Sequence, residues 1–136
     1  MTKYIPYERR PLAIAGRDCL RICNEVSTRM QPMYKFQLGT SICNIAAKQA
    51  VCIYNALNEP MESKNKLSLI DKISELTNYL LVYIRVAKDI NQIDLSRFEE
   101  LITRLISIRK QIDNWKHAVE EAHKKIKKDP YDDFDF

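Results

Sequence analysis

Apolar residues recur at steps of three and four positions through four long segments of this 136-residue chain. Such spacing places them on one face of an α-helix, because a helix turns once in about 3.6 residues. Only two glycines, Gly16 and Gly39, are present, so few positions favour the tight turns of a sheet-rich fold. The length suits one domain with a sizeable core. The sequence therefore predicts a single all-α domain.

Prolines and short polar segments divide this pattern into helices. Pro32 follows the first helix and Pro60 the second, because a proline disfavours the helical conformation of the residue before it. The connecting segments are short, so consecutive helices should pack antiparallel. The predicted fold is an up-down-up-down four-helix bundle. Its helices are expected to begin near 12, 34–38, 63–68 and 94–96, and to end near 31, 58, 90 and 128.

Polar residues indicate where the third and fourth helices begin. Ser68, with Asp71 three positions later, fits a capping box for the third helix. Ser96 with Glu99 fits a second box for the fourth helix, and Asp94 is the alternative cap.

The second and third helices carry more apolar residues than one helical face holds. In the second helix they are Ile42, Cys43, Ile45, Ala46, Ala47, Ala50, Val51, Cys52, Ile53, Tyr54, Ala56 and Leu57, and in the third they include the run Tyr79–Ile84. A helix that is apolar on most sides must be buried on more than one side. We therefore expect these two helices to be buried between subunits of a closed homo-oligomer.

The net charge of +4 is divided unevenly, because four aspartates lie within the last eight residues and leave residues 1–128 with +8. A basic body suits a polyanionic partner, usually nucleic acid. The first and last helices of the bundle can be neighbours, and their basic residues would then form one long surface that follows phosphates. The candidates there are Arg17, Arg21, Arg104, Arg109, Lys110, Lys116, Lys124, Lys125, Lys127 and Lys128. These basic residues could instead be solvated surface side chains without a binding role. The final lysines could be there because the helix dipole favours positive charge at a helix C-terminus.

Two further residues admit two interpretations each. Arg85 interrupts the most apolar stretch, and a buried arginine requires a partner. Either Arg85 forms an intrahelical ion pair with Asp89 at the bundle surface, or it lies at a subunit seam or in a central pore, where it faces phosphate or a carboxylate. Trp115, the only tryptophan, is either a core residue or an exposed anchor.

The residues that catalysis or metal binding would need are not arranged for it. His117 and His123 are about 240° apart around the fourth helix, and no paired C-x-x-C or H-E-x-x-H motif occurs. Cys19, Cys23, Cys43 and Cys52 lie within apolar helical patterns and are expected to pack as small hydrophobes. Gly39 stands alone, without a phosphate-binding loop. We therefore expect no enzyme activity, no metal or cofactor, and no small-molecule substrate.

The two ends differ from the body. Residues 1–11 hold two prolines and no helical period, which indicates an extended basic arm, and residues 129–136 form an acidic, aromatic tail expected to be disordered. The tail is solvated, competes with nucleic acid for the basic surface, or docks on a partner. No secretory signal or apolar span of about 18 residues occurs, so we expect a soluble cytoplasmic protein with no membrane contact.

Four motifs, in their order and spacing, resemble those of a known family. They are Tyr34-Lys35-Phe36-Gln37-Leu38-Gly39, Ile53-Tyr54-Asn55-Ala56, Arg85 with Asp89, and Trp115-Lys116-His117-Ala118. Over about residues 30–120 the chain resembles the small bacterial four-helix-bundle proteins typified by the accessory variability determinant of diversity-generating retroelements. Asp113-Asn114 depart from that pattern, because many relatives carry glycines there.

This resemblance implies a barrel-like homopentamer without a catalytic centre. It implies binding to RNA and DNA and association with a reverse transcriptase that copies a template RNA into mutagenised cDNA. Arg85 and the basic groups of the fourth helix would bind the nucleic acid. The alternative is the sister branch encoded within ribosomal RNA intervening sequences, an oligomeric protein-interaction module of unsettled role.

Overall fold

The structure, a computed structural model, describes residues 10–127, with side chains as far as Lys125. The part of the chain that it describes is almost entirely helical. The elements are α1 (Pro11–Arg29), α2 (Pro32–Tyr34), the π-helix η2 (Lys35–Gly39), α3 (Thr40–Asn58), α4 (Lys64–Asp89) and α5 (Leu95–Lys127). Because α2, η2 and α3 follow one another without a break, they form one helical rod with a π-helical turn.

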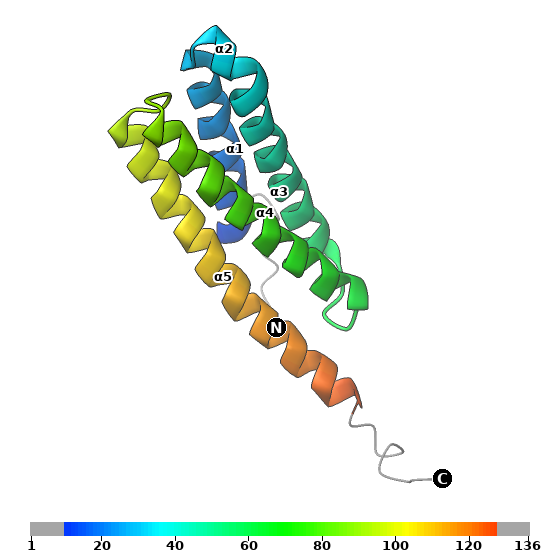
Figure 1. Ribbon diagram of the computed structural model, residues 1–136. Coiled ribbons are helices and arrows are strands. Elements are labelled where there is room, and N and C mark those ends of the chain that lie inside the picture. Colours follow the sequence, from blue (N-terminus) through cyan, green and yellow to red (C-terminus); the bar gives the residue numbers. More distant parts are fainter. Residues whose placement is uncertain (1–9, 128–136) are drawn as a thin grey trace.

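The long helices form a four-helix bundle (Figure 1). Helix α1 packs against α3 and α5, and α4 packs against the same two helices from the other side. Leu, Ile, Val, Ala and Cys side chains from all four helices make one core, in which Ile22, Ile53, Ile84 and Ile108 are fully buried. The predicted all-α bundle and the predicted contact between the first and last helices are confirmed.

The second helical rod begins earlier than the sequence predicted. It starts at Pro32 rather than between Tyr34 and Leu38. A proline suits the first position of a helix, because its fixed φ is helical and the N–H it lacks would have no partner there. Pro32 therefore begins a helix as well as following one.

Both predicted capping boxes are wrong, but the alternative cap Asp94 and the predicted start of the third helix between Ser63 and Ser68 are confirmed. Ser63 caps α4, and its side chain accepts a hydrogen bond from the Asn65 N–H at 3.2 Å, whereas Ser68 lies exposed inside the helix. Asp94 precedes α5, and its Oδ1 accepts from the Arg97 N–H at 2.8 Å. In each case the side chain just before the first turn accepts a hydrogen bond from a backbone N–H that has no partner within the helix, as an N-cap does.

Two features fix how α3 sits against its neighbours. Gly39 lies against α1 so closely that a Cβ there would be 2.5 Å from Ser27 Oγ. On the other side, the fully buried Gln49 donates from Nε2 to Thr77 Oγ1 at 2.8 Å, and Thr77 donates to the Ile73 carbonyl at 2.7 Å. This hydrogen bond between two buried polar side chains can form in only one register of α3 against α4, although the Gln49 side-chain oxygen has no partner there.

Helix α5 is much longer than α1 and continues past the end at which α1 begins (Figure 1). Beyond that level it packs beside the α3–α4 turn, where His123 Nε2 lies 2.9 Å from the Met61 carbonyl oxygen. The start of α1 therefore leaves a step in the bundle, and the half-buried Trp115 lies at this step.

Several large apolar side chains remain exposed on α3 and α4. They are Val51, Tyr54, Tyr79, Val82 and Val86, with Val82 61% exposed. The surplus of apolar residues predicted for these helices is thus on the surface of the single chain. Within residues 10–127, none of the helices is both long and apolar enough to cross a membrane.

Candidate nucleic-acid interface

The groove between α1 and α5 holds a closed ring of ion pairs, which we call the α1–α5 seam. Three arginines and three carboxylates alternate around it, so that each side chain contacts two of opposite charge. Its members are Asp18, Arg21 and Glu25 on α1, and Arg97, Glu100 and Arg104 on α5.

The contacts between the two helices are the shortest in the seam. Arg97 lies 2.9 Å from Glu25 and 3.0 Å from Glu100. Arg104 Nη1 donates to Asp18 at 2.9 Å, and Arg104 Nη2 lies 3.5 Å from Glu100. Arginine matches carboxylates well because its guanidinium presents several donors in one plane.

Arg21 closes the ring on the α1 side. It lies 3.1 Å from Glu25 and 3.7 Å from Asp18, and its side chain is more exposed than those of the two α5 arginines. The six charges sum to zero. Arg21 and Arg104, both candidates from the sequence, are therefore neutralised within the protein.

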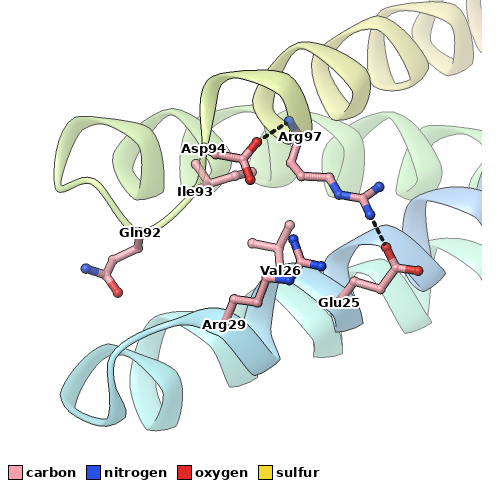
Figure 2. Close-up of a pocket in the computed structure, with 7 residues that line it drawn as sticks. All are labelled: Glu25, Val26, Arg29, Gln92, Ile93, Asp94 and Arg97. Atoms are coloured by element: carbon pink, nitrogen blue, oxygen red, sulfur yellow. Dashed lines mark hydrogen bonds and ion pairs between the residues drawn. The ribbon is translucent and has the colours of Figure 1, made fainter.

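A small hollow of about 30 Å³ lies beside the seam, between the end of α1 and the α4–α5 turn. Figure 2 shows Glu25, Arg29 and Arg97 around it, with Arg97 reaching Glu25 and the Asp94 carboxylate accepting from the Arg97 N–H. Such a volume holds only about one or two water molecules. The hollow is too small for an organic ligand.

A second set of basic residues lies on α4 and α5, and we call it the α4–α5 face: Arg85, Arg109 and Lys116 where the two helices meet, and Lys110 next to Arg109 on the exposed side of α5. Lys116 contacts Asp71 at 2.9 Å, and this hydrogen bond raises the pKa of the lysine above its usual range. Arg109 donates to the side-chain oxygen of Asn78, a neutral amide. The charge of Arg109 is thus held in place without being neutralised.

The position of Arg85 follows from these two contacts. Asp71, Asn78 and Arg85 follow at intervals of about two helical turns, so they share one side of α4. Because Asp71 and Asn78 both face α5, Arg85 faces it too, one step further along. The face extends about 21 Å from Asp71 to Arg85 at 1.5 Å per residue.

Arg85 is exposed, and it forms no ion pair with Asp89 or any other carboxylate within residues 10–125. Of the two interpretations of Arg85, the intrahelical pair is therefore wrong, because Arg85 and Asp89 are both exposed and do not meet. Lys110 is likewise exposed, without a carboxylate partner in that same range.

The remaining candidates are spread along the molecule. Arg17 is exposed on α1, Lys124 contacts Glu121 at 3.4 Å, and Lys125 is exposed near the end of α5. The side chain of Lys127, all of Lys128, most of the predicted arm and the acidic tail lie outside the described residues.

The predicted single basic surface along α1 and α5 is thus wrong in its geometry. Arg109 and Lys116 face α4, while the groove toward α1 contains as many carboxylates as arginines. Sequence reasoning missed the roles of Arg97 and Glu100. Their spacing of three residues, with Arg104 four further on, was the available signal.

The described residues offer little for catalysis or metal binding. Burial raises the pKa of the Cys19 thiol to about 12 and also raises the pKa values of Cys23, Cys43 and Cys52. A protonated thiol is a poor nucleophile and a poor metal ligand. Within the same residues, no three His, Cys, Asp or Glu side chains gather as a metal site would require.

Comparison with known proteins adds no relative. The chain matches no protein-family model, and no curated protein is detectably similar to it in sequence. The resemblance in the four motifs therefore stays a prediction.

Proposed function

We propose that this chain is a non-catalytic accessory protein that binds the phosphate backbone of RNA or DNA on the α4–α5 face. The observation that carries the proposal is the contrast in pairing: Arg85, Arg109 and Lys110 are exposed and have no carboxylate partner within residues 10–125, whereas the arginines of the α1–α5 seam are neutralised. Unpaired surface cations are the groups that phosphates can engage.

Such a face would hold nucleic acid without reading its sequence. Arginines and lysines on a helical surface contact phosphates, while reading a sequence requires side chains that reach base edges. Phosphate contacts also release counterions, which makes the affinity fall steeply as salt rises. The protein would need no metal or cofactor for this task.

The partner in the proposal is a reverse transcriptase of a diversity-generating retroelement, as the four motifs imply. The protein would then keep a template RNA or its cDNA beside the polymerase. A genomic neighbourhood with a reverse transcriptase gene and paired template and variable repeats supports this part of the proposal. A neighbourhood without them contradicts it.

The test of nucleic-acid binding is a filter-binding titration of the intact protein with single-stranded RNA and DNA over a salt series. We expect the logarithm of the affinity to fall linearly with the logarithm of the salt concentration. Absence of binding at low salt would overturn the proposal. A salt-independent affinity would also contradict it, because it would exclude phosphate contacts.

A second candidate function is a protein-interaction module that assembles through α3 and α4. The exposed side chains of Val51, Tyr54, Tyr79, Val82 and Val86 favour it, because exposed apolar patches mark interaction surfaces. Both functions are compatible with a homo-oligomer, a pentamer by the resemblance. Light scattering tests the assembly, because a monomer at micromolar concentration would exclude the homo-oligomer. If that monomer also failed to bind nucleic acid, only binding to a different protein would remain.

A further inference from the structure

An open hollow of about 390 Å³ lies at the step where α1 begins, between the end of α3 and the middle of α5. Its apolar side chains are those of Pro11, Leu12 and Leu57, its aromatic one is Trp115, and its polar ones are those of Arg10, Gln111 and Asn114. Its volume is within the range of about 300–1,000 Å³ that small organic ligands occupy. The proposed function does not yet use it.

One face of the Trp115 ring is already covered. The Lys66 ammonium lies 4.8 Å from the centre of that ring and donates to the Glu59 carbonyl at 2.8 Å. Lys66 does not line the hollow, whereas Trp115 does. The half-buried Trp115 packs against the core, and the part of its indole that borders the hollow is the part that a flat ligand can contact.

Two side-chain amides follow one another near this ring on α5. Gln111 donates from Nε2 to Ser107 Oγ at 3.2 Å, which leaves its carbonyl oxygen and a second amide hydrogen for a ligand. Asn114 is exposed. Amides carry a donor and an acceptor side by side, as the hydrogen-bonding edge of a nucleobase does.

Two basic side chains lie at or near the hollow. Arg10 borders it, held by a hydrogen bond from Nη1 to the Leu57 carbonyl at 3.2 Å. Burial and the charge of Arg10 lower the pKa of Lys66, so the two cations lie near each other. Among the described residues that line the hollow, none is acidic.

We propose that this hollow binds one unstacked base of a single-stranded nucleic acid, with the base on the Trp115 ring and its edge on Gln111 and Asn114. The inference rests on the proposed function, which supplies the strand. It adds a site for a base to a protein otherwise expected to touch only the backbone.

Trp115 is the only tryptophan of the chain, so its fluorescence reports this site alone. The experiment titrates the intact protein with a short single-stranded oligonucleotide and with an abasic analogue of the same length. We expect the first to quench the emission and to bind about five- to hundredfold more tightly, since stacking one base on an aromatic ring contributes about 1–3 kcal/mol. The abasic analogue should bind in a salt-dependent way without quenching.

Surface variants test the same site without endangering the core. Gln111→Ala and Asn114→Ala should each reduce the preference for the base-bearing strand several-fold, while Asn44→Ala, an exposed amide on α3, should leave it unchanged. Trp115→Phe should keep part of the preference and Trp115→Leu should abolish it, with helicity checked by circular dichroism.

Equal binding of the two strands with unchanged emission would overturn the inference and leave backbone binding intact. Failure of both strands to bind would overturn the proposed function as well. A third result would also overturn the inference: Trp115 shielded from acrylamide in the free protein and unaffected by either strand.

Discussion

Arg104 and Arg109 lie five residues apart on α5 but belong to different surfaces, because that spacing turns about 140° around the helix. Arg104 faces α1, where Asp18 and the nearby Glu100 neutralise it. Arg109 faces α4, where it meets the neutral amide of Asn78. The facing helix therefore decides whether an arginine holds the bundle together or remains available to a ligand.

The largest effect expected from this difference is on stability. Arg104→Glu would place a third carboxylate beside those of Asp18 and Glu100. The site is partly buried, because the side chain of Arg104 is 34% exposed and that of Asp18 is 30% exposed. We expect the free energy of unfolding to fall by about 2 kcal/mol, less than for a fully buried pair because water screens the charges. Urea unfolding measures it.

The matched control for that variant is Lys110→Glu, the same change of charge on an exposed position of the same helix. It should change the unfolding free energy by less than about 0.5 kcal/mol. Equal destabilisation by the two variants would mean that the seam contributes nothing beyond net charge.

A smaller effect separates the ring from an isolated ion pair. A double-mutant cycle on Asp18 and Arg104, with Asp18→Asn and Arg104→Met, should give a coupling energy of about 1 kcal/mol, because neighbouring charges hold both side chains in place. The same cycle on Asp71 and Lys116, which are about half exposed, should give about 0.2–0.5 kcal/mol. A larger coupling for the second pair would contradict the difference between the two surfaces.

These contrasts show what the sequence could and could not reveal. The periodicity of apolar residues predicted the four-helix bundle, because the buried residues of a helix, such as Ile53 and Ile84, lie on one of its faces. Arg104 and Asp18 are 86 residues apart in sequence, and their pairing depends on the register between α1 and α5. The spacing of residues within one helix does not encode that register. The sequence revealed an excess of basic residues, but it did not reveal which of them would lack a carboxylate partner in the folded bundle.

The same limit applies to the hollow. Trp115 was visible as a single aromatic residue with two possible roles. Its combination with Arg10 and Leu57 exists only because α5 is longer than α1 and leaves a step at this end. Relative helix lengths across the bundle determine this, and residue patterns within one helix do not.

The smallest expected effect is on one titration. Asp71 raises the pKa of Lys116, so the pair stabilises the fold fully below the unfolded pKa of about 10.4, and the contribution is lost as the pH rises through the raised folded value. In Asp71→Asn we expect the Lys116 pKa, followed by NMR, to move back toward its usual value. Asp113→Asn should move it less, because Asp113 is the weaker influence.

The central claim is that unpaired cations on the α4–α5 face bind phosphate. The most direct test combines Arg85→Ala, Arg109→Ala and Lys110→Ala and repeats the salt series with single-stranded RNA. The slope of log affinity against log salt should become shallower by about 2, because each of the three lost phosphate contacts contributes about 0.7 to it. A control that replaces the exposed Lys35, Lys48 and Lys64 by alanine should keep the original slope. An unchanged slope in the first variant, or an equal loss in the control, would contradict the account.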